Sequence, residues 1–183
     1  MLPEGGVVTG HASSCRGSRG VVEVFSMARN FEETVRSLSQ PKALAIGCYG
    51  ESVASYRYRM LAEKATTEEH RAIFVDMAEE EQTHHQVLQQ IFKEKFPDSD
   101  FVLSPEDKDL IIAGSRTLDL SSEKTFARAL ELIYESERKT GQFYTVFHNS
   151  TSLADLKPLL KGMADECFEH AERLKGLPPM PWS

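Results

Sequence analysis

The sequence predicts an all-α fold, an antiparallel four-helix bundle in which a long crossover joins two helical hairpins. The main observation is an internal repeat, in which six residues recur as the same amino acid 86 positions later. These pairs are Glu51 and Glu137, Tyr58 and Tyr144, Met77 and Met163, Glu80 and Glu166, His84 and His170, and Leu88 and Leu174. In each half the tyrosine precedes the histidine by 26 residues, which leaves room for a turn and an antiparallel helix. Two units indicate paired hairpins rather than a solenoid.

The first hairpin is predicted to consist of helices over about residues 41–65 and 66–95. Ser39 is a suitable cap for the first helix, and Thr66 with Glu69 forms a predicted capping box for the second. Inward-facing residues recur at steps of three and four. The two rows are Leu44, Cys48, Glu51, Ser55, Tyr58 and Ala62, and Phe74, Met77, Glu81, His84, Leu88 and Ile91.

The crossover is predicted over residues 96–120, with a short helix that follows Ser104 and ends near Ala113. The third long helix is expected from residue 121 or 122 to about 147. The fourth is expected to begin at Asp155, which can cap it. Their inward rows are Leu130, Ile133, Glu137, Thr140, Tyr144 and Phe147, and Leu156, Leu160, Met163, Cys167, His170 and Leu174.

The composition indicates a cytoplasmic protein with one globular domain over residues 27–183, preceded by a disordered tail over residues 1–26 that is rich in Gly and Ser. A net charge of −7 argues against a nucleic-acid surface. No apolar run is long enough to span a membrane. Three cysteines without a CxxC pair argue against a disulfide framework.

Three of the four inward rows carry a carboxylate near mid-length (Glu51, Glu81 and Glu137), and two rows carry an imidazole (His84 and His170). A buried ionised carboxylate is costly unless it is paired or binds a cation. The rows contain no lysine or arginine, so a bound divalent cation is predicted. Mixed Glu and His ligands suit iron, manganese or zinc.

The fourth helix departs from this pattern, because Cys167 stands where the repeat would place the counterpart of Glu81. Glu166 is adjacent but points about 100° away around the helix. Three alternatives follow: Cys167 is a thiolate ligand, Glu166 reaches the site through a helix distortion, or the second metal has fewer protein ligands. We expect an intact first metal position and an atypical second one. The remaining histidines are interpreted as surface residues: His11, His70, His85 and His148.

Several segments of the chain together resemble rubrerythrins, a family of ferritin-like proteins. These segments are GESVASYRY at 50–58, LAEKA at 61–65, AEEEQTH at 78–84, Glu137 with Phe143 and Tyr144, and HAERL at 170–174. The resemblance covers about residues 41–175. It is most specific in the first hairpin.

The resemblance implies a ferritin-like bundle that holds a di-iron centre. By position, the iron ligands would be Glu51, Glu81, His84, Glu137 and His170. Tyr58 and Tyr144 would donate hydrogen bonds to the carboxylates. Two departures lie in the second half: Cys167, and Thr140 in place of a further carboxylate.

The resemblance also implies an oxidoreductase of the rubrerythrin type that acts on peroxide or dioxygen. The paired CxxC motifs of a rubredoxin domain are missing from the sequence, so an external electron donor protein is expected. A homodimer is expected as well. The alternatives are a di-iron hydroxylase of an organic substrate and a non-enzymatic metal-binding bundle with a degenerate second site.

Overall fold

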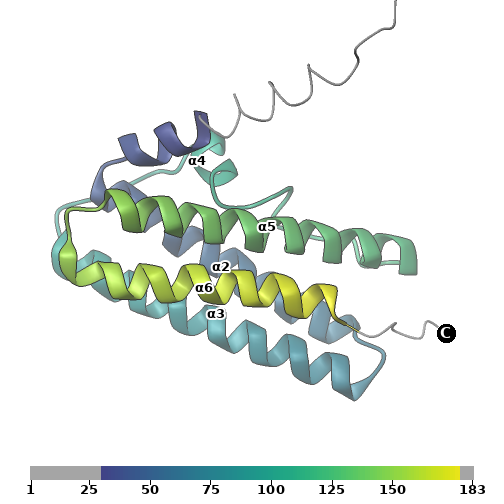
Figure 1. Ribbon diagram of the computed structural model, residues 1–183. Helices are drawn as coiled ribbons and strands as arrows, with labels where there is room; N and C mark the ends of the chain where they lie inside the picture. Colours follow the sequence, from purple (N-terminus) through teal and green to yellow (C-terminus); the bar gives the residue numbers. More distant parts are fainter. Residues whose placement is uncertain (1–29, 178–183) are drawn as a thin grey trace, which may run out of the picture.

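The computed structural model describes residues 30–177, which contain helices and no strand (Figure 1). The helices are α2 (Gln40–Lys64), α3 (Glu68–Lys95), α4 (Pro105–Asp109), α5 (Glu123–Ser150), the 3₁₀ turn η1 (Ala154–Leu156) and α6 (Lys157–Lys175). Residues 30–37 are also helical, as a lead-in to α2. The tail predicted over residues 1–26 lies outside the described residues.

The four long helices form two hairpins, α2 with α3 and α5 with α6, as the repeat predicts. Figure 1 shows them side by side, with the crossover and α4 on the side of α2 and α5. The all-α bundle prediction is therefore confirmed. Among the described helices, none has both the length and the hydrophobicity that a membrane span requires.

The start of α3 differs from its prediction by one residue. Thr67, not Thr66, is the N-cap, and its side chain accepts a hydrogen bond from the backbone N–H of His70 at 3.2 Å. The capping box predicted with Glu69 is therefore wrong, since the third helical position is occupied by His70. The interpretation of His70 as a surface residue is also wrong, because His70 is buried and its Nδ1 lies 2.6 Å from the Thr67 hydroxyl.

The start of α6 was also predicted incorrectly. Asp155 lies in η1 rather than at the cap, and its carboxylate accepts from Lys95 Nζ at 2.5 Å, which ties the turn of the second hairpin to the end of α3. The crossover helix ends at Asp109, one turn earlier than predicted, and Gly114 follows with a positive φ of 69°. α5 continues almost one turn beyond its predicted end.

The core consists of two apolar clusters, one toward each end of the bundle. The first contains Leu44, Leu88, Phe147 and Leu160, and the second contains Phe74, Met77, Ile133 and Leu174. On all four long helices, the residues between the two clusters include buried polar side chains. A polar layer thus crosses the middle of the bundle with apolar packing on both sides.

Candidate metal centre

The polar layer is built around three carboxylates that converge from different helices. Glu51 on α2, Glu81 on α3 and Glu137 on α5 are 1%, 1% and 3% exposed. Each lies on the inward face because it continues the three-and-four spacing of apolar residues in its helix. The sequence-based expectation that these acids meet in the interior is therefore met.

Two groups of side chains within this layer have the geometry to hold a metal ion. The His84 group consists of Glu51, Glu81 and His84, and the His170 group consists of Glu81, Glu137 and His170. Within each group, one ligand atom from each residue lies within 4.8 Å of the others. Glu81 belongs to both groups, so its two oxygens can serve adjacent positions.

Both imidazoles turn Nδ1 toward the carboxylates. His84 Nδ1 lies 3.5 Å from Glu51 Oε2 and 3.4 Å from Glu81 Oε2. His170 Nδ1 lies 2.6 Å from Glu81 Oε1 and 3.9 Å from Glu137 Oε2. Nδ1 is therefore the nitrogen that each histidine offers to a metal, and Nε2 faces the other way.

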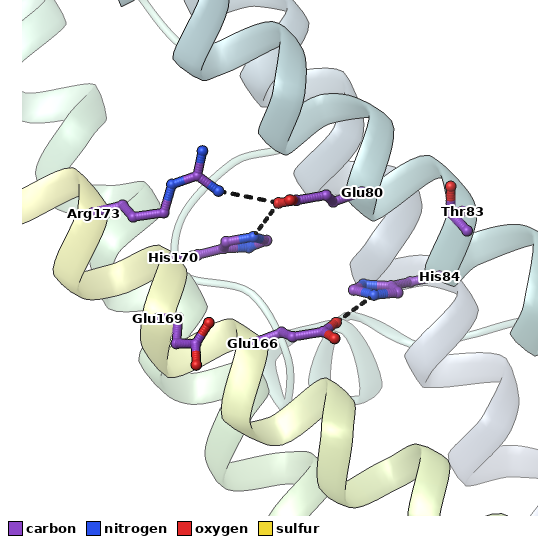
Figure 2. A pocket seen from close by; sticks show the side chains of 7 residues that line it. All are labelled: Glu80, Thr83, His84, Glu166, Glu169, His170 and Arg173. Carbon is purple, nitrogen blue, oxygen red and sulfur yellow. Dashed lines mark hydrogen bonds and ion pairs between the residues drawn. The ribbon is translucent and has the colours of Figure 1, made fainter.

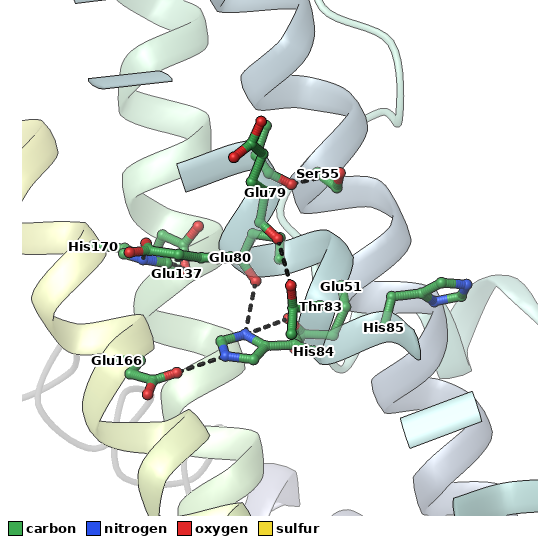
Figure 3. Close-up of polar contacts among 12 residues, drawn as sticks. Glu51, Ser55, Glu79, Glu80, Thr83, His84, His85, Glu137, Glu166 and His170 are labelled. Carbon is green, nitrogen blue, oxygen red and sulfur yellow. Dashed lines mark hydrogen bonds and ion pairs between the residues drawn. The ribbon is translucent and has the colours of Figure 1, made fainter. Parts of the chain in front are cut away.

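The Nε2 atoms are held by carboxylates from the opposite hairpin (Figures 2 and 3). Glu166 on α6 lies 2.6 Å from His84 Nε2, and Glu80 on α3 lies 2.8 Å from His170 Nε2. Carboxylates in this position fix the ring orientation of a metal-binding histidine and raise its basicity. Glu166 thus contacts a candidate ligand and belongs to neither ligand group. The role of Glu80 was missed, although its recurrence as Glu166 was a signal for it.

The two tyrosines also make crossed contacts, that is, contacts with a side chain of the opposite hairpin. Tyr144 on α5 donates to Glu51 Oε1 at 2.5 Å, and Tyr58 on α2 donates to Glu137 Oε1 at 2.6 Å. These contacts match the donors that the resemblance implies. Gly47 leaves room for the first contact, because a Cβ there would lie only 3.1 Å from the Tyr144 hydroxyl. Each carboxylate therefore keeps its second oxygen free of the tyrosine.

Several buried polar atoms in the layer lack a hydrogen-bond partner: Glu51 Oε2, Glu81 Oε1 and His170 Nδ1. Glu81 Oε1 and His170 Nδ1 are 2.6 Å apart but are not aligned as a hydrogen bond. Buried polar groups are normally satisfied, so unpartnered atoms that face one another indicate a missing shared partner. Carboxylate and imidazole donors converging in this way fit a divalent transition-metal ion.

The electrostatics of the layer keep it protonated when no cation is bound. Burial and the charge of Glu81 raise the pKa of Glu51 well above its usual range and that of Glu137 to about 8. Burial would also raise the pKa of Glu81, but the adjacent carboxyl group of Glu51 and the two imidazoles beside it hold that pKa below its usual range. Burial lowers the pKa of the histidines, but the carboxylates outweigh it and raise His84 to about 11 and His170 to about 9.

The two departures in the second half have different structural outcomes. Cys167 is buried within the core, and its sulfur belongs to neither ligand group. A cysteine side chain is two heavy-atom bonds shorter than a glutamate, so it cannot reach as far as Glu81 does from the equivalent position. Thr140 donates to the backbone carbonyl of Ile111 at 2.8 Å, so its hydroxyl serves the crossover.

The sequence did not reveal a buried cation beside the layer. Arg57, 1% exposed, donates to the carbonyl oxygens of Ala113 and Ser115 at 2.7 and 2.5 Å and to the Ser136 hydroxyl at 2.8 Å. It forms no ion pair with the three carboxylates. Arg57 therefore anchors the crossover to α2 and α5, and the layer still lacks a permanent cation to balance its acids.

A cavity of about 330 Å³ between α3 and α6 leads from the surface to both imidazoles. Its walls include Thr83, Glu169 and Arg173 in addition to the two crossed Glu–His pairs (Figure 2). The layer is therefore reached from the α3–α6 side. The opposite side, at α2 and α5, is covered by the crossover.

Comparisons with known proteins agree with this architecture. Residues 42–119 match the family model described as Rubrerythrin. No curated protein matches the chain. A solved structure of a hypothetical protein from Pyrococcus furiosus is 22% identical, with a TM-score of 0.68, and the match covers 79% of this chain and 90% of that one. At this identity the likeness shows a shared fold.

Proposed function

We propose that this chain, whose residues 42–119 match the rubrerythrin family model, binds two transition-metal ions, most favourably iron, and acts as an oxidoreductase on peroxide or dioxygen. The observation that carries the proposal is the pair of ligand groups that share Glu81. The unpartnered atoms of this buried layer supply donors on both sides of the shared carboxylate.

The ligand groups define what each residue would do. His84 and Glu51 would hold one ion, His170 and Glu137 the other, and Glu81 would bridge them. Bound iron would supply the exchange of electrons with the oxidant. The tyrosine hydroxyls hold the carboxylates in place, and the apolar clusters at both ends exclude water along the bundle axis.

The cavity that reaches the layer supports a small polar oxidant over an organic substrate. It is lined largely by charged side chains, among them Glu80, Glu166, Glu169 and Arg173. A hydroxylase of an apolar compound would need apolar walls at this point. Turnover would then need electrons from an external donor protein, since the candidate ligands include no further redox group.

Metal analysis combined with a single-turnover reaction tests the proposal. Protein loaded anaerobically with iron(II) should contain about two ions per chain, as the two ligand groups require. Hydrogen peroxide should then oxidise the iron rapidly, as seen in the ultraviolet absorption of the product. Glu81→Gln should lose both iron binding and the reaction with peroxide, because Glu81 belongs to both ligand groups.

Glu79→Gln is the matched control, since Glu79 is an exposed acid on the same helix. It should retain wild-type metal content and reactivity. A wild-type protein that binds no iron under these conditions would refute the proposal. Iron binding without oxidation by peroxide or dioxygen would leave a metal-binding bundle and refute the enzymatic part.

A further inference from the structure

The two crossed Glu–His pairs border the same cavity but differ in how firmly they are held. Glu80 contacts His170 and also accepts from Arg173 Nη1 at 3.2 Å, and Arg173 is in turn paired with Asp76 at 2.7 Å. Glu166 forms a single ion pair among residues 30–177, the one with His84. The His170 side is therefore closed by a network, and the His84 side by one contact.

Exposure follows the same asymmetry. The side chain of His84 is 16% exposed and that of His170 is 3% exposed. Glu166 is 50% exposed, and the neighbouring Glu169 also lies on the cavity wall at the surface. Glu80 is 43% exposed, close to Glu166, so the two sides differ mainly in the arginine that pairs with Glu80 and in the exposure of the imidazoles. A cation that arrives from solvent thus meets a carboxylate that is not paired with an arginine on the His84 side.

Other approaches to the layer are less favourable for a cation. On the α2–α5 side, Arg57 of α2 and Lys139 of α5 place positive charge beside the crossover and donate to its carbonyl groups. Two further cavities, one beside Leu130 and Leu174 and one beside Phe31, contact none of the candidate ligands. The α3–α6 cavity combines negative charge with direct contact to both imidazoles.

We infer that metal ions reach the layer through the α3–α6 cavity by way of Glu166 and Glu169, and that the His84 group fills before the His170 group. Glu166 would attract the arriving ion while it still holds the Nε2 atom of His84, whose Nδ1 already faces the inner carboxylates. Arg173 would delay the second ion by occupying Glu80. This inference rests on the proposed metal binding, and it concerns the rate and order of uptake rather than the number of ions.

Stopped-flow uptake of cobalt(II) by the metal-free full chain tests the route, because bound cobalt(II) absorbs in the visible range. Glu166→Gln keeps the size of the side chain and removes its charge. Filling of the two groups should give two phases of cobalt uptake. Glu166→Gln should slow the faster phase, which is the filling of the His84 group, at least about threefold, since local charge in a cleft raises association rates by about 10-fold or more. Loading is measured at saturating cobalt(II), so that the final content should still reach about two ions per chain although the affinity of the His84 group is lowered. Glu79→Gln, with the same charge change outside the cavity wall, should load at the wild-type rate.

The order of filling is tested in variants that retain one group each. Glu137→Gln keeps the His84 group and Glu51→Gln keeps the His170 group, so each should bind one ion. Glu137→Gln should load faster than Glu51→Gln. Adding Glu166→Gln should slow loading only in the Glu137→Gln variant, which keeps the His84 group. Arg173→Gln should accelerate loading of the His170 group, because it frees Glu80.

Each outcome decides a specific part of the inference. Wild-type loading rates in Glu166→Gln, with full cobalt content, would overturn the route while leaving the proposed metal binding intact. Equal loading rates in the two single-group variants would overturn the order. A wild-type chain that takes up no cobalt would refute metal binding itself, and this result would be visible in the final content rather than in the rate.

Discussion

Proton release should govern metal binding in the His170 group, and the structure gives the size of the effect. In the metal-free layer the pKa of Glu137 is raised to about 8 and that of His170 to about 9. The Glu137 carboxyl and the His170 imidazole both carry a proton at pH 7, and each must lose it to act as a ligand. Below pH 8, binding one ion therefore displaces two protons.

Two displaced protons make the apparent affinity rise about 100-fold per pH unit, or about 2.7 kcal/mol. Between pH 8 and 9 only His170 still carries its proton, so the rise falls to about tenfold per unit. Above pH 9 the affinity should level off. The sign follows from the raised pKa values, because protons compete with the metal most strongly at low pH.

Glu51→Gln isolates the His170 group for this measurement. Cobalt(II) affinity is determined from about pH 6 to 10 by competition with a chelator of known proton affinity. Glu137→Gln provides the comparison, because the pKa of His84 is raised to about 11 and its pH dependence should continue beyond pH 9. A change of less than about tenfold between pH 6 and 8 in the His170 group would refute the assigned protonation states.

Four further outcomes follow from the structure. Cys167→Glu should tighten binding of the second ion at least about tenfold in a competition titration, because it restores a carboxylate at the position that corresponds to Glu81. An unchanged affinity would mean that a side chain at position 167 does not reach the layer. Tyr144→Phe should destabilise the metal-free protein by about 1–3 kcal/mol in urea unfolding, because Glu51 loses its donor. Arg57→Met should lower stability by about 3 kcal/mol, since it removes three hydrogen bonds that join α2 to the crossover and to α5, and an unchanged midpoint would contradict its anchoring role. The metal-free protein should lose thermal stability as pH rises from about 5 to 9, because its layer binds more protons folded than unfolded; a melting temperature that rises over this range would contradict the raised pKa values.

The sequence was sufficient for the bundle and for which side chains come together in the polar layer. The reason is physical: a buried helix face repeats every three or four residues, and an acid on such a face stands out against its apolar neighbours. The repeat of Glu51 and Tyr58 as Glu137 and Tyr144 then fixed how the second hairpin corresponds to the first. Burial of the three carboxylates agrees with this reasoning.

Contacts between helices were harder to predict, because they depend on rotations that spacing within one helix does not determine. The pairing of Glu166 with His84 requires α6 to lie against α3. The burial of Arg57 requires a crossover that has no periodic pattern of its own. Two helix starts were predicted wrongly for different reasons: at α3 the adjacent residues Thr66 and Thr67 offer competing caps, and at α6 a 3₁₀ turn that contains Asp155 precedes the helix.

The exchange of partners between hairpins makes the two halves of the chain mutually dependent. Tyr58 and Tyr144 each serve the other hairpin's acid, and Glu80 and Glu166 each serve the other hairpin's imidazole. A pseudo-twofold axis therefore passes through the layer, as it would in a dimer of identical hairpins. Fusion into one chain allows the halves to differ, so a cysteine could replace one acid without its partner changing as well.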